Sequence, residues 1–176
     1  MENERGKTLE AIQFAIQMEI DGKAYYQKAS GETGNKVGRE LFEWLAGEED
    51  KHRQRFEDIY KAIRKQKAWS EVDVQPRKGD ILKTLFSEAM RTTGPTVKAA
   101  STELDTIAKA MEMENKTEKF YSRRGAEAVY DAEKKLYTSL AAEERGHFLA
   151  LVDYREYLID PAGWFRKAEH HSLDGG

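Results

Sequence analysis

Residues 41–56 read LFEWLAGEEDKHRQRF, and residues 136–151 read LYTSLAAEERGHFLAL. Each segment carries apolar residues at a spacing of three or four, which is the pattern of an amphipathic helix, and each contains Glu-x-x-His. Residues three apart lie on one side of a helix, so a glutamate and a histidine at this spacing can bind one ion together. Apolar residues flank both motifs on the same side, which predicts that they point into a helical core. The motifs are Glu49 with His52, and Glu144 with His147.

The two segments belong to an internal repeat that extends over most of the chain. Residues 8–63 align with residues 103–158 at a constant shift of 95 positions, without a gap. Helical periodicity would align apolar residues with one another, but it would not align glutamates, histidines and tyrosines. The matches are Leu9, Ile12, Glu19, Tyr26, Leu41, Leu45, Glu49 and His52 with Leu104, Ile107, Glu114, Tyr121, Leu136, Leu140, Glu144 and His147. The repeat therefore predicts two similar helix pairs.

The composition excludes several classes of protein. The 176 residues include 32 acidic and 29 basic ones, and the formal net charge of −3 argues against a dedicated nucleic-acid-binding protein. The absence of cysteine excludes disulfides, cysteine-type zinc sites and thiolate-held iron–sulfur centres within this sequence. No apolar run approaches the roughly 20 residues that cross a membrane, and residues 1–10 are too charged for a signal peptide. We therefore expect a soluble cytoplasmic protein that binds neither nucleic acid nor membrane.

Four long segments have the apolar spacing of helices, and β-branched runs are nearly absent. We expect helices over residues 8–30, 38–67, 102–129 and 131–158. Short connections join the members of each pair, whereas residues 68–100 contain turn signals such as Gly94-Pro95 and form one long connection. This is the connectivity of a ferritin-like four-helix bundle with one long crossover between two helix pairs. The predicted fold is all-α, with the bundle over residues 1–160 and a tail over residues 161–176.

Two further glutamates occupy unusual positions. Glu19 and Glu114 lie in the middle of apolar stripes, where an isolated carboxylate would cost several kcal/mol unless it were paired or bound to metal. Tyr26 and Tyr121 follow them by seven residues, which is two helical turns, so each phenol lies on the same face and can donate a hydrogen bond to a carboxylate. Together with the two Glu-x-x-His motifs, these glutamates complete the ligand set of a dinuclear carboxylate site.

The charges of such a site balance. Four carboxylates carry four negative charges, which two divalent cations neutralise, so the filled site can be buried. Oxygen ligands with two imidazoles suit Fe(II) or Mn(II) better than zinc, and we expect two iron ions, with manganese as the alternative. The predicted metal ligands are Glu19, Glu49, His52, Glu114, Glu144 and His147.

Other polar residues are interpreted as lying outside this ligand set. Glu48 and Glu143 each precede a motif histidine by four residues, and we interpret them as charges that either surround the site or face solvent. His170 and His171 are expected in the exposed tail. Trp44 is expected to pack in the core or at an interface.

At these residues the sequence resembles the rubrerythrin branch of the ferritin-like superfamily, over about residues 8–158. The motifs that carry the resemblance are Glu19 with Tyr26, Glu49-Asp50-Lys51-His52, Glu114 with Tyr121, and Glu144-Arg145-Gly146-His147. The resemblance implies a non-haem di-iron centre in a four-helix bundle. Glu49 and Glu144 would bridge or cap the metals, each histidine would hold one metal, and the tyrosines would bond to ligand carboxylates. It also implies a homodimer.

The sequence departs from the family pattern at two points. Rubrerythrins end in a rubredoxin-like module whose cysteines hold an iron, and this sequence has no cysteine. We therefore expect electrons to come from a separate donor such as a rubredoxin or a flavoprotein. The family also carries an extra glutamate three residues after the ligand that corresponds to Glu114. Thr117 stands there, with Glu118 one step further, and this change bears on peroxidase behaviour.

The leading hypothesis is a di-iron oxidoreductase that reduces peroxide or O2 and protects against oxidative stress, as the resemblance implies. The alternative is an iron-binding protein, namely a ferroxidase or iron-handling protein without catalytic peroxide turnover. Oxygenation of an organic substrate is a third possibility and would need a pocket beside the metals. A metal-free bundle with a buried charged network is the fourth.

Overall fold

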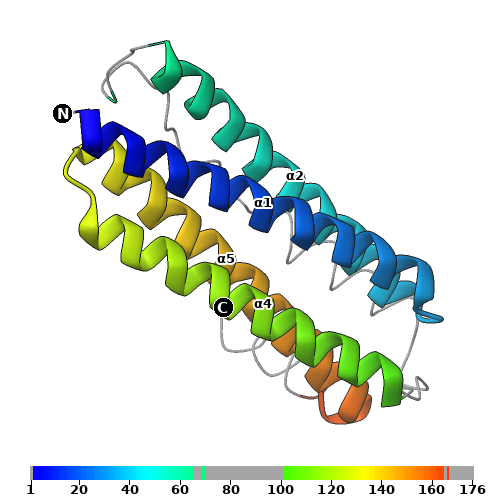
Figure 1. The fold of residues 1–176 in the computed structure, drawn as a ribbon. Coiled ribbons are helices and arrows are strands. Elements are labelled where there is room, and N and C mark those ends of the chain that lie inside the picture. The colour runs from blue at the N-terminus through cyan, green and yellow to red at the C-terminus, as the bar shows by residue number, and fades with distance from the viewer. Residues whose placement is uncertain (1, 66–68, 70–100, 165, 167–176) are drawn as a thin grey trace, which may run out of the picture.

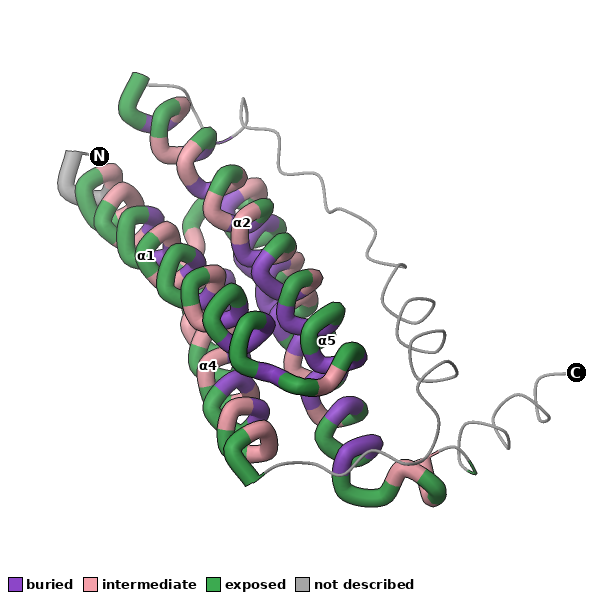
Figure 2. The backbone as a smooth tube through the Cα atoms, turned by 90° about the vertical axis from the view of Figure 1, so that its right-hand side faces the viewer, coloured by how far each residue is buried: buried purple, intermediate pink, exposed green. Residues whose placement is uncertain are grey.

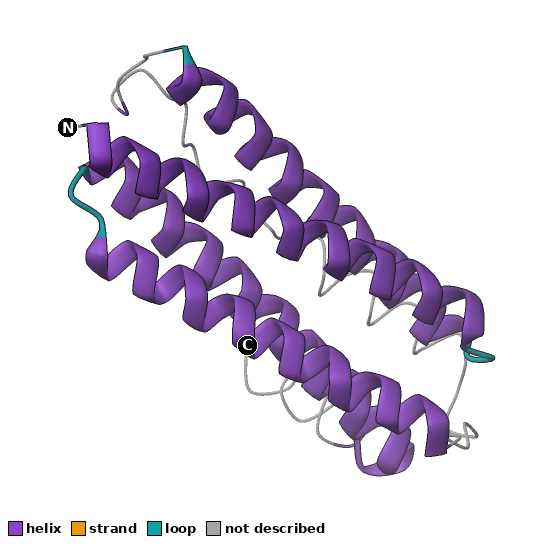
Figure 3. Ribbon diagram, in the orientation of Figure 1, coloured by secondary structure: helices purple, strands orange, loops and turns teal. Residues whose placement is uncertain are grey.

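A computed structural model of the chain describes residues 2–65, 69, 101–164 and 166 (Figure 1). Over these ranges the chain forms four long helices and no strand (Figure 3). They are α1 (Glu2–Glu32), α2 (Lys36–Arg64), α4 (Ser101–Glu127) and α5 (Asp131–Ile159). The prediction of an all-α fold is confirmed. Most of the predicted connection over 68–100 and most of the predicted tail, including His170 and His171, lie outside the described residues.

Each helix pair is joined by a short connection, drawn in teal in Figure 3. Residues 33–35 join α1 to α2, and the side chain of Asn35 accepts a hydrogen bond of 2.9 Å from the backbone N–H of Val37. This contact satisfies one of the free donors at the start of α2 and fixes where the helix begins. Residues 128–130 join α4 to α5. Such short connections require the two helices of each pair to run antiparallel.

The two pairs pack so that α1 and α4 are also antiparallel. Tyr26, late in α1, bonds to Glu114 of α4, and Tyr121, late in α4, bonds to Glu19, which precedes Tyr26 in α1. The end of α2 and the start of α4 therefore lie at opposite ends of the bundle (Figure 1). A connection between those ends has to cover the length of the bundle, as in a ferritin-like fold with one crossover.

Two apolar clusters fill the bundle, and the buried residues follow the inner sides of the helices (Figure 2). The repeat distributes its copies between the clusters, with Leu45 in one and Leu140 in the other. Six buried polar residues from the two motifs and the two apolar stripes lie among these side chains. The outer faces are exposed, and no helix within the described ranges has the length and apolar character of a membrane span.

Candidate metal centre

All six predicted ligand residues are buried, and each residue is at most 4% exposed. Two come from single positions on α1 and α4, and four come from the Glu-x-x-His motifs of α2 and α5. Because each residue lies on the apolar stripe of its helix, packing of the four stripes carries the polar groups into the interior. They are Glu19 on α1, Glu49 and His52 on α2, Glu114 on α4, and Glu144 and His147 on α5.

The six side chains form two overlapping groups, each with ligand atoms that lie within 4.8 Å of one another. The first group is Glu19, Glu49, His52 and Glu144, and the second is Glu49, Glu114, Glu144 and His147. The glutamates of the two motifs belong to both groups. Two ions held by these groups would share Glu49 and Glu144, which is the bridging position that the resemblance implied for them.

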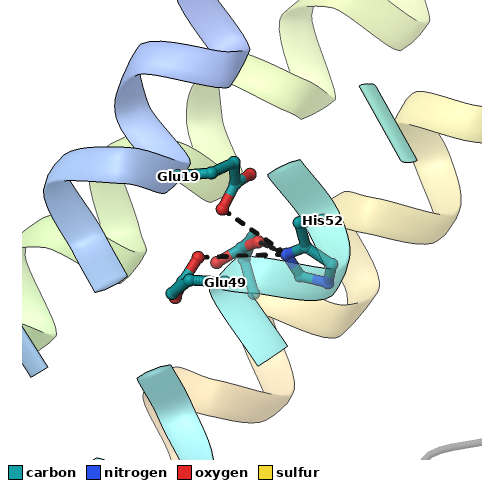
Figure 4. A group of neighbouring side chains, drawn as sticks. Glu19, Glu49 and His52 are labelled. Atoms are coloured by element: carbon teal, nitrogen blue, oxygen red, sulfur yellow. Dashed lines mark ion pairs between the residues drawn. The ribbon is translucent and has the colours of Figure 1, made fainter. Parts of the chain in front are cut away.

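The first group converges on one ring nitrogen of His52. The Nδ1 atom lies 2.9 Å from Glu144 Oε1, 3.7 Å from Glu19 Oε2 and 3.9 Å from Glu49 Oε2. Figure 4 shows the Glu19 and Glu49 carboxylates turned toward this nitrogen from two different helices. The opposite ring nitrogen faces away from the group, so His52 offers a single nitrogen to a shared ion.

The second group repeats this arrangement around His147. Its Nδ1 atom lies 3.5 Å from Glu144 Oε2, 3.6 Å from Glu114 Oε2 and 3.8 Å from Glu49 Oε1. The two imidazole rings stack with their centroids 5.5 Å apart and their planes 19° from parallel. The pseudo-symmetry of the sequence repeat is thus reproduced in the geometry of the centre.

The two tyrosines hold the carboxylates of α1 and α4 from the side away from the histidines. The Tyr26 hydroxyl donates to Glu114 Oε1, and the Tyr121 hydroxyl donates to Glu19 Oε1. Each tyrosine therefore serves the glutamate of the other repeat half, because α1 and α4 pack antiparallel. The spacing of seven residues predicted a phenol beside a carboxylate, but only the packing of the helices determines which carboxylate accepts.

Six polar atoms of the centre have no hydrogen-bond partner among the described residues, and each of the six belongs to a residue of one or both ligand groups. An unsatisfied buried polar atom costs about 1–3 kcal/mol, so such a concentration indicates a ligand. The atoms are carboxylate oxygens and imidazole nitrogens, which suit Fe(II) or Mn(II). The residues present therefore fit a dinuclear metal site. The atoms are Glu19 Oε2, His52 Nδ1, Glu114 Oε2, Glu144 Oε1, Glu144 Oε2 and His147 Nδ1.

Without metal, the buried cluster balances its charges with protons. Burial raises the pKa of Glu49 well above its usual range, and the neighbouring carboxylates raise it further. Burial and the carboxylate of Glu144 raise the pKa of Glu114 to about 7. Burial alone would lower the pKa of His147, but Glu114 and Glu144 raise it to about 10. The pKa of His52 is also raised well above its usual value. Burial lowers it, but the nearby carboxylates, chiefly that of Glu144, raise it more.

Glu143 contacts the far side of His52. Its Oε2 atom lies 3.1 Å from His52 Nε2, its Oε1 accepts a 3.0 Å hydrogen bond from Ser139, and Arg55 lies 3.6 Å from Oε1. The sequence left open whether Glu143 lies beside the site or faces solvent, and the structure places it beside the site. Its repeat counterpart Glu48 pairs instead with Lys51.

The sequence did not indicate Arg55, because the repeat places an alanine, Ala150, at the corresponding position. Trp44, expected as a packing residue, lies edge-on to His147 with ring centroids 5.3 Å apart. Trp44 thus packs against one histidine of the centre, whereas Glu143 contacts the other.

Thr117 stands where the family carries an extra glutamate, and Glu118 follows it. Neither residue belongs to either ligand group. The Thr117 hydroxyl donates to the backbone carbonyl of Met113, one turn earlier in α4, at 3.1 Å. The Glu118 carboxylate accepts from Ser122 at 3.1 Å. The candidate centre therefore consists of six ligand residues, without a seventh from this part of α4.

Comparisons with known proteins agree with this fold. The family model described as rubrerythrin matches residues 10–152 of the chain. Among solved structures, a hypothetical protein from Pyrococcus furiosus is 23% identical and superposes with a TM-score of 0.62. The match covers 86% of this chain and 89% of that one, and it shows that the two share a fold. No curated protein sequence matches the chain.

Proposed function

Because the chain belongs to the rubrerythrin family, we propose that it holds two iron ions in the buried centre and reduces peroxide or O2. The observation that carries the proposal is the coincidence of two features. Of the nine buried side-chain atoms without a hydrogen-bond partner in the described part of the chain, six belong to residues of the two ligand groups. Two shared glutamates then place two ions side by side, which suits a reaction that needs two electrons.

The residues of the centre divide the work of holding the ions. Glu19 with His52 would hold one, Glu114 with His147 would hold the other, and the motif glutamates would bind both. The tyrosines fix the outer oxygen of the α1 and α4 glutamates and so orient the inner oxygen toward the ions. The motif glutamates shared by the two ions would be Glu49 and Glu144.

Glu143 sets the protonation of His52. When Nε2 donates its proton to this carboxylate at 3.1 Å, Nδ1 is left with a free electron pair for an ion. The apolar clusters on both sides exclude bulk water from the centre. When bound, two ferrous ions would supply the two electrons that peroxide takes up, with two protons, to form two water molecules.

We further propose that the electrons which restore the ferrous state come from a separate donor such as a rubredoxin or a flavoprotein. The support is the absence of cysteine from this sequence, which leaves no thiolate-held iron in it. The homodimer implied by the resemblance remains a prediction.

Anaerobic loading with two ferrous ions per chain, followed by one equivalent of H2O2, tests the proposal. The amounts of peroxide and of ferrous iron that remain after mixing are both measured. We expect one peroxide to disappear for every two ferrous ions oxidised, faster than with the same iron free in buffer. Peroxide consumption no faster than that of free ferrous iron would contradict the proposal. Glu112 is exposed on α4, so the variant Glu112→Gln serves as the matched control.

The second candidate is ferroxidase or iron handling. It is favoured by the position of Thr117 outside the ligand groups, because the family carboxylate at that place is linked to iron changing its ligands. Repeated additions of peroxide with a reductant separate the two candidates. A peroxide-reducing enzyme keeps its iron through many cycles, whereas an iron-handling protein releases ferric iron after one.

A further inference from the structure

A line of aromatic side chains leads from the centre to the far end of α5. Tyr26 stacks on Phe42 with ring centroids 6.2 Å apart, and Phe42 meets Tyr154 edge-on at 6.3 Å. Tyr154 stacks on Tyr157 at 6.4 Å, and Tyr157 meets Trp164 edge-on at 5.9 Å. The first ring is bonded to a proposed ligand carboxylate. The last ring is partly exposed and follows α5.

Besides Tyr26, two oxidisable groups in this line have a carboxylate that can accept their proton. The Tyr154 hydroxyl donates to Glu103 Oε1 at 2.7 Å, and the Trp164 indole nitrogen donates to Asp153 Oδ1 at 2.8 Å. Loss of one electron makes a phenol or an indole N–H strongly acidic, so a bonded carboxylate lets the electron and the proton leave together. Burial raises the pKa of Asp153 above its usual value, which makes it a better proton acceptor.

The aromatic branches that begin at Tyr121 are not built in this way. From Tyr121 the rings continue through Phe120 at 5.6 Å to the half-exposed Phe14 at a further 5.1 Å. Phenylalanine is far harder to oxidise than tyrosine or tryptophan, so this branch contains no redox-active residue beyond its first ring.

The branch through Tyr137 lacks a carboxylate acceptor. Tyr137 lies 5.9 Å from Tyr121, but its hydroxyl has no hydrogen-bond partner in the described part of the chain. The Arg124 guanidinium stands over its ring at 5.8 Å and opposes positive charge there. The repeat also places Ile59 and Ala62 where the other half has its two stacked tyrosines of α5, so only one half carries a continuous line.

We propose that Tyr26, Tyr154, Tyr157 and Trp164 form an electron-transfer route that supplies the centre from the Trp164 end, with Phe42 as the packed contact between Tyr26 and Tyr154 and not as a site of oxidation. The inference rests on the proposed function. The route acts when peroxide meets a centre that can give only one electron. It then prevents an oxidising equivalent from remaining in the buried interior, where it would attack the ligands.

The electrons and protons of this step balance. Peroxide takes two electrons, together with two protons that come from solvent, and becomes two water molecules. One electron comes from a ferrous ion and the other from Trp164, by way of the tyrosines. The indole proton of Trp164 moves to Asp153 and leaves a neutral tryptophan radical. A small one-electron reductant of the ascorbate class then restores the indole at the surface.

The first experiment tests the route without iron. Azide radicals produced by pulse radiolysis oxidise tryptophan in the purified protein, and absorption follows the radicals. We expect tryptophan radical absorption to convert to tyrosyl absorption at a rate independent of protein concentration. This conversion is the reverse of the proposed transfer, because connected rings exchange the oxidising equivalent in both directions until a reductant removes it at Trp164. Trp164→Phe should lose this phase, and Trp69→Phe, at the repeat-related position, should keep it. Persistence of the phase in Trp164→Phe would overturn the route.

The second experiment uses protein loaded with one ferrous ion per chain, mixed with one H2O2 and no reductant. Freeze-quenched electron paramagnetic resonance should show an aromatic radical, and peptide mass spectrometry should find oxidation at Trp164. Tyr154→Phe should lose that oxidation, while Tyr137→Phe on the same helix should keep it. Oxidation confined to Trp44, which packs on His147, would overturn the route.

The two experiments separate the two proposals. If peroxide is not consumed but the iron-free conversion is lost in Trp164→Phe, the proposed function fails and the connection between Trp164 and the tyrosines stands. If peroxide is consumed and Trp164→Phe changes neither the radical nor the conversion, the route fails and the proposed function stands.

Discussion

Glu143 and Glu48 occupy matched positions of the repeat but make different contacts. Glu143 lies against His52 Nε2 at 3.1 Å, and it is held there by Ser139 and Arg55. Glu48 pairs with Lys51 on its own helix. A carboxylate behind a metal-binding histidine fixes the ring and strengthens the nitrogen as a ligand. The difference between the two halves makes the two metal positions unequal at the scale of single residues.

Glu143→Gln should therefore weaken metal binding at the His52 position by about 10–100-fold. Glu48→Gln is the matched control, because it changes the same residue type at the repeat-related position and should alter binding little. Isothermal titration with Mn(II), which avoids oxidation, measures both positions. Equal effects of the two substitutions would show that the Glu143 contact does not support a metal site.

Metal loading should also release protons. Glu49 and both histidines have raised pKa values, Glu114 has a pKa of about 7, and His147 has one of about 10. Below their pKa values these groups carry protons, which a bound ion displaces. At pH 6 we expect release of roughly two or more protons per chain. The release should decrease as the pH rises through these values.

Titration in two buffers of different ionisation enthalpy measures this release. Because the metal competes with protons, the apparent affinity should rise with pH over the same range. An affinity that does not change between pH 6 and pH 9 would contradict the assignment of these side chains as ligands.

The ends of the helices show what local sequence pattern does and does not determine. The predicted first helix begins at residue 8, but α1 begins at Glu2. Arg5 donates to the carbonyl oxygens of Ile63 and Arg64 at 2.7 and 2.9 Å. It thereby satisfies free carbonyl groups at the end of α2 and ties the first turns of α1 to the bundle. Apolar spacing carries no information about such a contact between helices.

The first turn of α2 packs closely against the other helix pair at Gly38. A Cβ atom at Gly38 would overlap the Tyr154 hydroxyl and would lie 2.9 Å from Glu103 Oε1. Both groups belong to a hydrogen-bonded contact and have little freedom to move. The absence of a side chain at Gly38 therefore allows the α1–α2 pair to meet the α4–α5 pair at this end.

Gly38→Ala should destabilise the protein. The overlap costs about 1–3 kcal/mol, which exceeds the gain of up to about 1 kcal/mol in helix propensity. Gly47→Ala, in the same helix but with nothing within 4 Å of the added Cβ, should instead stabilise it by up to about 1 kcal/mol. Urea denaturation measures both. A stabilised Gly38→Ala variant would contradict the described packing of α2 on α5.

At the scale of the whole molecule, the repeat made the centre predictable. Identical glutamates, histidines and tyrosines at one constant shift identified six side chains, and the structure brings those six together from four helices. Their assignment as metal ligands remains a prediction. Periodicity identifies which face of each helix is buried, and this is enough to place these groups in one interior.

Features that arise only from packing between helices were not predictable. The acceptor of each tyrosine depends on α1 and α4 running antiparallel. The contacts of Glu143 and the aromatic route to Trp164 depend on residues that differ between the two halves, so the repeat carries no signal for them.

Metal analysis tests the central claim most directly. The protein is loaded anaerobically with excess Fe(II), freed of unbound iron, and measured by elemental analysis against protein concentration. The two ligand groups predict two iron ions per chain. The double variant Glu49→Gln with Glu144→Gln should retain about one or fewer, and Glu112→Gln should retain two. Fewer than about one ion per chain in the natural sequence, or two in the double variant, would contradict a dinuclear centre at these residues.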